Sequence, residues 1–233
     1  MVRTALLVTC LVGAGVATEP LPLELDHISI VVPPGAPMDG PAFEAAGFRF
    51  LGPPTVHPGE GITTRSVGFE NLYIELVWVT NRAELTAADP DWGLRLRHND
   101  PKFVRFGLAL RRHEAGDSIP FPTREFGSRK LRVSQTANQE PFVFVVPPEL
   151  AWPAQAAALA AEMKHPNGAR KVTRVTWVTR KRGGPSPAMD YVGTHGVVRF
   201  GFAAPYFIEM ELDDGALGKV TDLRPQLPIV FRR

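Results

Sequence analysis

The chain has 233 residues, enough to bury a substantial core in one large domain or two small ones. Its hydrophobic content of 44% and charged content of 21% are typical of a soluble globular protein. The net charge is only +2 and the sequence has no dense basic run, so we expect neither a nucleic-acid partner nor binding to an anionic membrane surface.

Residues 1–17 differ from the rest of the chain. Arg3 is followed by an uncharged apolar run that is too short to span a bilayer and ends in small residues. This pattern predicts a secretory signal peptide cleaved before Thr18, with a buried N-terminal helix as the alternative. We therefore expect a secreted or periplasmic protein whose mature form has no membrane segment. Cys10, the only cysteine, is lost with this segment, so any metal must be bound by His, Asp and Glu.

The chain then divides into short segments, punctuated by 23 prolines and 21 glycines. Alternating apolar residues predict a strand over residues 25–32, with Leu25 and His27 on the face opposite Ile28. A short helix and three further strands are expected next, at residues 39–47, 48–51, 62–69 and 72–79. The resulting order is β-α-β-β-β.

The second half of the chain repeats this theme in reduced form. An alanine-rich helix is expected at 153–164, and strands at 103–111, 129–135, 142–146, 172–179, 197–202 and 206–212. The segment Tyr73-Ile74-Glu75-Leu76 recurs as Phe207-Ile208-Glu209-Met210. We therefore expect an α+β fold in a single domain, residues 18–233. Its βαβββ module at about 24–80 and degenerate repeats at about 100–148 and 170–213 form a curved, partly closed sheet.

His27 and Glu75 lie on the polar faces of two of these strands. In each strand the opposite face is apolar and suited to cover by a helix, so a curved sheet turns both side chains into its concavity. An imidazole and a carboxylate placed there can hold a divalent cation. The alternative, open at this point, is that both side chains are exposed on the second face of an antiparallel sheet.

Short motifs point to a family. The segment Leu25-Asp26-His27-Ile28-Ser29-Ile30-Val31-Val32 resembles the opening strand of the vicinal oxygen chelate superfamily, and Phe43-Glu44-Ala45-Ala46-Gly47-Phe48 is similar to its helix-to-strand turn. His57-Pro58-Gly59, followed by a strand and then Tyr73-Ile74-Glu75-Leu76, resembles the glyoxalase-like branch. The resemblance covers roughly residues 24–80, and extends in part to residues 141–144 and 165–168. It implies paired βαβββ modules, with metal ligands at His27 and Glu75.

The sequence departs from that family at the other half of the site. A second His and a second Glu are implied from the partner module, but Arg105 stands where the His is expected, and the strand ending at Val146 has no Glu. Either His57, His165 or Glu209 completes a site for Zn, Mn, Ni or Fe, or no metal binds.

Three functions remain open. The resemblance implies a divalent-metal-dependent enzyme of the lyase, isomerase or dioxygenase type, in which the ion polarises a small oxygen-bearing substrate and Glu209 acts as general base. The alternative is a metal-free protein of the same fold that binds or sequesters a small molecule, and the third is an extracellular interaction module without a ligand. The expected partners are a small-molecule substrate and, as one open arrangement, a second copy of the chain in a homodimer. Aromatic surface for a pocket is available from Tyr73, Trp78, Trp92, Trp152, Trp177, Phe142 and Phe207.

Overall fold

The computed structural model describes residues 23–36, 39–88, 103–112, 121–127, 129–134, 139–179, 185–195, 197–203 and 205–233. The expected signal peptide, Cys10 and Trp92 lie outside these ranges. Within the described residues, no helix is long and apolar enough to cross a membrane.

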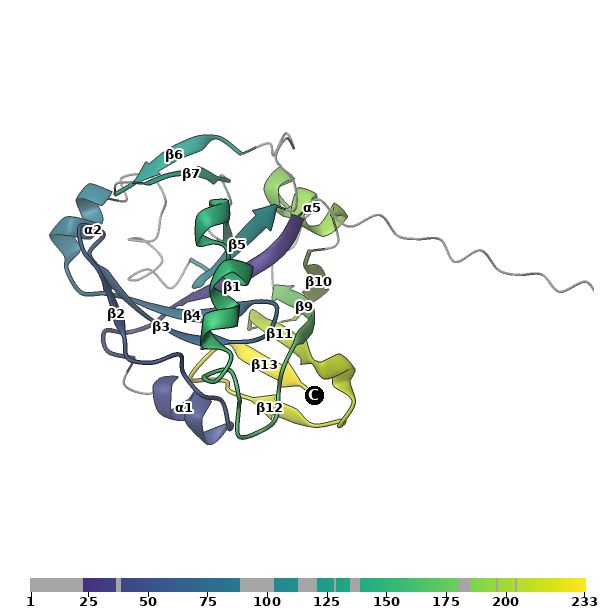
Figure 1. Ribbon diagram of the computed structural model, residues 1–233. Coiled ribbons are helices and arrows are strands. Elements are labelled where there is room, and N and C mark those ends of the chain that lie inside the picture. Colours follow the sequence, from purple (N-terminus) through teal and green to yellow (C-terminus); the bar gives the residue numbers. More distant parts are fainter. Residues whose placement is uncertain are drawn as a thin grey trace, which may run out of the picture.

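The larger of two sheets has eight strands and curls into a half-barrel (Figure 1). Its first unit contains β1 (Leu23–Val31), α1 (Asp39–Ala45), β2 (Thr55–His57), β3 (Ile62–Gly68) and β4 (Tyr73–Val79), and α2 (Arg82–Ala88) follows. Its second unit contains β5 (Phe106–Arg112), β6 (Thr123–Phe126), β7 (Arg129–Val133) and β8 (Phe142–Val145). The spatial order is β2-β3-β4-β1-β5-β8-β7-β6, so the two units join edge to edge through β1 and β5.

The smaller sheet has five strands in the order β10-β9-β11-β13-β12. It is built from β9 (Val172–Thr179), α5 (Pro187–Thr194), β10 (Arg199–Phe202), β11 (Phe207–Leu212), β12 (Val220–Asp222) and β13 (Ile229–Arg232). Both sheets have the same central pattern. Two neighbouring strands run antiparallel to each other, and each has on its other side a strand parallel to itself. These four strands are β4-β1-β5-β8 in the larger sheet and β10-β9-β11-β13 in the smaller.

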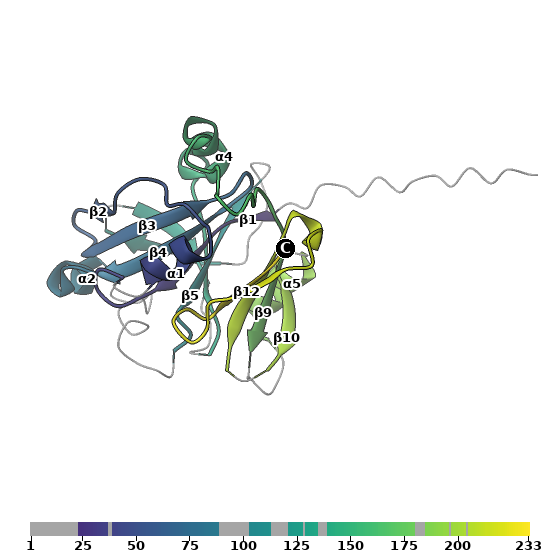
Figure 2. The same ribbon diagram turned by 90° about the horizontal axis from the view of Figure 1, so that it is seen from below.

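A linking segment connects the two sheets and projects from the body of the molecule (Figure 2). It contains η1 (Pro148–Leu150), α4 (Trp152–Ala156) and η2 (Ala157–Leu159). Outside this segment, a 3-10 turn, η3 (Asp213–Gly215), follows β11. Trp152 anchors the segment at its base, because its side chain is 2% exposed.

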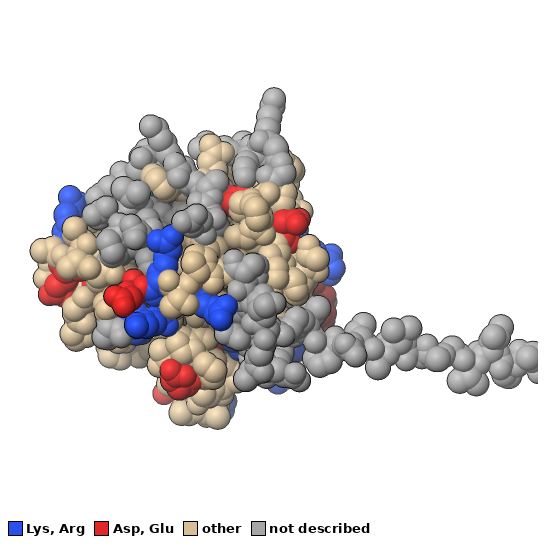
Figure 3. Space-filling model, turned by 90° about the horizontal axis from the view of Figure 1, so that it is seen from above, with Lys and Arg blue, Asp and Glu red and all other residues tan. Residues whose placement is uncertain are grey.

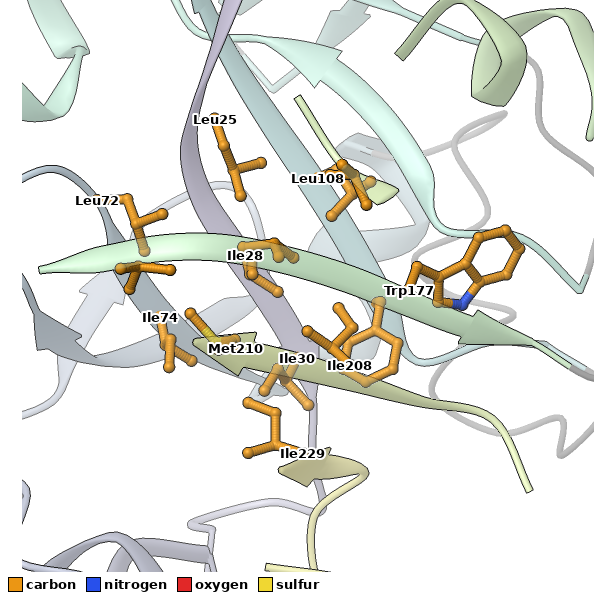
Figure 4. Close-up of a cluster of buried hydrophobic side chains, with 14 of the residues drawn as sticks. Leu25, Ile28, Ile30, Leu72, Ile74, Leu108, Trp177, Ile208, Met210 and Ile229 are labelled. Carbon is orange, nitrogen blue, oxygen red and sulfur yellow. The ribbon is translucent and has the colours of Figure 1, made fainter. Parts of the chain in front are cut away.

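The main hydrophobic core lies between the two sheets. Ile28, Ile74 and Leu108 from the larger sheet meet Ile208 and Met210 from the smaller one (Figure 4), and all five side chains are completely buried. Full burial of a large aliphatic side chain contributes about 1.5–3 kcal/mol, so this contact holds the convex face of the half-barrel against the second sheet. The concave face is left available for a site.

The predicted α+β fold with a curved sheet of βαβββ units is confirmed, but several local predictions were wrong. Residues 48–51 form no strand, and the strand that follows α1 is β2. The helix expected at 153–164 is shorter and continues as a 3-10 turn. The face of β4 expected to be covered by a helix also packs on the second sheet, because Ile74 shares one buried cluster with Ile208 and Met210 (Figure 4).

A β-bulge in β1 changes which side chains share a face. The pairing of β1 with β5 shifts between Leu25 and His27, so Asp26 is the additional residue. Strict alternation placed Leu25 on the face of His27, whereas the bulge turns Leu25 into the core between the sheets. Asp26 is thereby brought beside His27, where it contributes to the site described next.

Candidate functional site

The concave face of the half-barrel contains a cavity of about 350 Å³. Strands β1, β3, β4, β7 and β8 form its floor and walls, and residues of the linking segment, among them Leu150 and Leu159, close one side. The volume is at the lower end of the range for pockets that bind small molecules. A second, smaller hydrophobic cluster, which includes Val31, Val77 and Leu131, fills the rest of the concavity.

His27 points into this cavity from the middle of β1 and is 5% exposed. Its Nδ1 lies 2.8 Å from Oδ1 of Asp26, so a carboxylate accepts the Nδ1–H hydrogen bond. This contact leaves Nε2 directed to the cavity, 3.9 Å from Oε2 of Glu75. No hydrogen bond to Nε2 is formed within the described residues. Asp26 therefore fixes the orientation of the His27 ring, and Nε2 faces the cavity, where it can bond to a ligand.

Asp26 is completely buried and is held by three neighbours. Its second oxygen, Oδ2, accepts a hydrogen bond from the backbone N–H of Trp152 at 2.7 Å and lies 3.7 Å from Nη1 of Arg111. The same guanidinium bonds to Glu24 and to the backbone carbonyls of Leu25 and Asn71. A buried carboxylate is tolerated only with such partners, and these fix its position and thereby the position of His27.

Aromatic rings surround His27. Tyr73 stacks on the imidazole with ring centroids 4.4 Å apart, and Phe144 meets it edge-on at 5.5 Å. Trp152 packs on the other side of Tyr73 at 4.9 Å. Burial, reinforced by the negative charges of Glu75 and Asp26, raises the pKa of Tyr73 well above its usual value of 10.0. Tyr73 is therefore a neutral phenol at physiological pH.

Glu75 is the acidic side chain at the polar end of the cavity. It projects from β4, next to Ser29 of β1, whose hydroxyl donates a hydrogen bond to Oε2 at 3.3 Å. The Glu75 side chain is 17% exposed, and no lysine or arginine pairs with it among the described residues. Its negative charge is therefore presented to the cavity.

The second unit has a different side chain at the position equivalent to His27. The parallel pairings set the equivalence, because β1 begins to pair with β4 at His27 and Tyr73, and β5 begins to pair with β8 at Gly107 and Phe142. This correspondence makes Gly107 the counterpart of His27. The sequence analysis predicted that Arg105 takes the position of this second His, but Arg105 lies before β5 and is exposed.

The counterpart of Glu75 is also apolar. β8 runs beside β5 as β4 runs beside β1, with Phe142 next to Gly107 as Tyr73 is next to His27. Phe144 therefore occupies the position of Glu75. A Cβ atom on Gly107 would lie 2.4 Å from the Phe142 ring, so that ring fills the space where a second ligand would stand. Half of the cavity is thus built to bind apolar groups.

A second charged cluster bridges the two ends of the half-barrel. Both oxygens of Glu60, in the turn after β2, accept hydrogen bonds from Nη2 of Arg129 in β7 at 2.5 Å. His57 lies beside this pair, with Nε2 3.0 Å from the Thr64 hydroxyl. Figure 3 shows basic side chains on the face above β6 and β7, with acidic ones next to them. β6 is the edge strand at this end and carries Arg124 and Glu125, and charged side chains on an edge strand discourage pairing with another chain.

The predicted site residues therefore separate into three groups. His27 and Glu75 come together, and His57 lines the same cavity but is bonded to Thr64. His165 lies outside this cavity, where its Nε2–H donates to the Gly68 carbonyl at 2.8 Å and its Nδ1 accepts from the Arg49 N–H at 3.0 Å. Glu209 lies in the second sheet, with Oε2 2.7 Å from Nε of Arg232. The structure thus brings neither His165 nor Glu209 to His27.

His165 is expected to make stability depend on pH. Burial lowers its pKa below the usual 6.5, so the unfolded chain binds the proton more tightly than the folded one. Stability is then full above about pH 6.5 and decreases as the pH falls toward the folded-state pKa. Urea unfolding at pH 7.5 and 5.5 should show a smaller loss of stability in a His165→Gln variant than in the wild type. Equal losses in both proteins would contradict this role.

The donor set does not complete a metal site. Within the described part of the chain, no group of three or more His, Cys, Asp or Glu side chains is arranged to hold a metal ion. His27 and Glu75 supply two donors, whereas catalytic zinc sites use three protein ligands. Asp26 is unsuited as the third, because both of its oxygens are already bonded behind the imidazole.

Several residues that form the site had only weak sequence signals. Tyr73, Trp152 and Phe142 of the aromatic set do line the cavity, but Trp78 and Trp177 belong to the core and Phe207 packs under Arg224. Phe144 and Arg129 were missed, although Phe144 alternates with Phe142 along one strand. Asp26 adjoins His27 in the sequence, but its contact with Trp152 spans 126 positions and cannot be anticipated locally.

The fold and site together define a half-barrel of two four-stranded units, the first of them βαβββ, around a mixed polar and aromatic cavity. No protein-family model matches this sequence, and no curated protein sequence matches it. Among solved structures, the fold is similar to that of a hypothetical protein from Staphylococcus aureus, with a TM-score of 0.58 and 11% sequence identity. The match covers 90% of this chain and 98% of that one. At this identity the similarity shows the fold alone.

Proposed function

We propose that this chain is a glyoxalase-like protein of the vicinal oxygen chelate superfamily that binds a small molecule in its concave cavity without a metal ion. The observation that carries the proposal is the difference between the two units. Where the first unit has His27 and Glu75, the second has Gly107 and Phe144, with the Phe142 ring over the glycine. Of the two His and two Glu ligands that the family resemblance implies, the cavity therefore has one of each, and apolar side chains occupy the other two positions.

The cavity suits a ligand with a flat apolar part and a polar end. Phe142 and Phe144 stack nearly parallel, with centroids 5.6 Å apart and an interplanar angle of 12°, and so present an aromatic wall. Ser29, His27 and Glu75 supply hydrogen-bonding groups beside this wall, with the His27 ring 5.5 Å from that of Phe144. Pockets of this composition bind through apolar contact and are made selective by a few polar groups.

A metal-dependent enzyme remains the second candidate, favoured by the 3.9 Å approach of His27 Nε2 to Glu75 Oε2 and by the carboxylate behind the imidazole. A carboxylate that accepts the second ring N–H is common behind metal-bound histidines. The two candidates differ in their response to chelator, and this difference can be measured.

Ligand binding with and without chelator tests the proposal. Small aromatic compounds should raise the melting temperature of the purified protein equally in the presence and absence of EDTA, and elemental analysis should find no stoichiometric metal. Phe144→Ala should weaken binding about tenfold by removing one aromatic face. Phe202→Ala is the matched control, because Phe202 is 69% exposed on the other sheet. Stoichiometric metal together with chelator-sensitive binding would establish the metal-dependent enzyme instead.

A further inference from the structure

The charges that face the cavity do not balance. Both arginines that line the cavity have acidic partners, since Arg129 binds both oxygens of Glu60 and Arg65 lies 3.5 Å from Glu44, and buried Asp26 is paired with Arg111. Glu75 is left with a serine hydroxyl and the imidazole of His27, without a lysine or arginine partner in the described residues. A partly buried carboxylate without a cation is costly, so a ligand that brings a positive charge gains the most at this position.

The walls next to Glu75 favour the same kind of group. Ring contacts run without interruption from Phe144 through His27 and Tyr73 to Trp152, at 5.5, 4.4 and 4.9 Å. The faces of Trp, Tyr and Phe rings attract cations, and most strongly where water is excluded. Because burial raises the pKa of Tyr73, its phenol stays neutral. Tyr73 therefore contributes an aromatic ring to this wall and no charge.

We infer that the ligand of this cavity is an organic cation, a protonated or alkylated amine whose nitrogen lies between the Glu75 carboxylate and the surrounding aromatic rings. The inference rests on the proposed small-molecule function and specifies its ligand class. An anionic ligand would face Glu75 with Arg129 and Arg65 already paired with Glu60 and Glu44, and a metal ion would find only the two donors His27 and Glu75. A neutral ligand would leave the Glu75 charge unbalanced.

Three compounds of similar shape and different charge test this inference on the purified full chain. Calorimetry at pH 7.5 with phenethylammonium, 2-phenylethanol and phenylacetate should give the tightest binding for the amine, about tenfold tighter than the alcohol, and the weakest for the carboxylate. The preference for the amine should decrease as salt is added, because part of it is electrostatic.

Glu75→Gln is the decisive variant, because it keeps the shape of the side chain and removes its charge. It should lose most of the preference for the amine and keep only the part that the aromatic rings supply. Its affinity for the alcohol should be unchanged, which also reports that the cavity is intact. Equal binding of the two compounds by the wild type, or a preference for the amine that is as large in Glu75→Gln as in the wild type, would overturn the inference but leave the proposed function standing. Amine binding that requires added Zn²⁺ or Mn²⁺ would overturn both proposals, as would wild type that binds none of the three compounds.

Discussion

Replacing Asp26 with alanine is expected to lower the free energy of unfolding by about 4 kcal/mol, although the residue lies outside the main core. Asp26 is completely buried and accepts hydrogen bonds from His27 Nδ1–H and the Trp152 N–H. Its loss leaves two buried donors without a partner and removes a charge beside Arg111. Cutting one partner out of a buried ionic network costs far more than deleting a surface charge.

Urea unfolding measures this loss, and Glu24→Ala is the matched control. Glu24 bonds to the same guanidinium as Asp26, but its side chain is 40% exposed. Its removal should therefore cost less than about 1 kcal/mol. Similar losses in both variants would mean that Arg111 alone, and not the buried carboxylate, stabilises this end of the half-barrel.

The same network connects the linking segment to the cavity. The backbone N–H of Trp152 and the imidazole of His27 are bonded to opposite oxygens of one carboxylate, and the Trp152 indole donates to the Phe69 carbonyl at 2.7 Å. The residue that closes one side of the cavity thus also positions its central histidine. The orientation of His27 is therefore a tertiary property of the fold.

The sequence predicted the central strands and the concave placement of His27 and Glu75, because both depend on alternation within a single strand. It could not predict that Leu25 turns into the core, since that depends on a bulge set by the pairing of β1 with β5. The same holds for the role of Gly107. A glycine has no side chain to signal a site, and only the register shows that it occupies the position equivalent to His27.

The comparison of the two units explains why the family resemblance was strong in one half only. The inter-sheet contacts that hold the convex face are apolar in both units, as Ile28 and Leu108 show. Packing therefore keeps the backbone similar while leaving the concave side chains free to differ. In the first unit those side chains are polar, and in the second Phe142 and Phe144 have taken their place. Two units with similar strand pairing can therefore present one polar and one aromatic half to the same cavity.

The turn between β2 and β3 packs closely on the start of α2 at Gly61, and Gly61→Ala is expected to lower the free energy of unfolding by about 3 kcal/mol or more. Its φ is +69°, and an added Cβ would lie 2.1 Å from the Asn81 carbonyl oxygen and 2.4 Å from the Leu85 nitrogen, both backbone atoms. The Gly61 carbonyl also accepts hydrogen bonds from the N–H groups of Thr80 and Asn81, so the turn cannot move away without breaking them.

Gly59 in the same turn provides the control that separates backbone strain from steric overlap. Its φ of +78° is as unfavourable for alanine, but an added Cβ would meet nothing within 4 Å. Gly59→Ala should therefore cost only the conformational penalty of about 1–2 kcal/mol. Urea unfolding of the two variants measures the difference in their free energies of unfolding. That difference is the cost of the steric overlap between the turn and the start of α2. Equal losses would show that backbone strain alone accounts for both, and that the turn can move away from α2 at little cost.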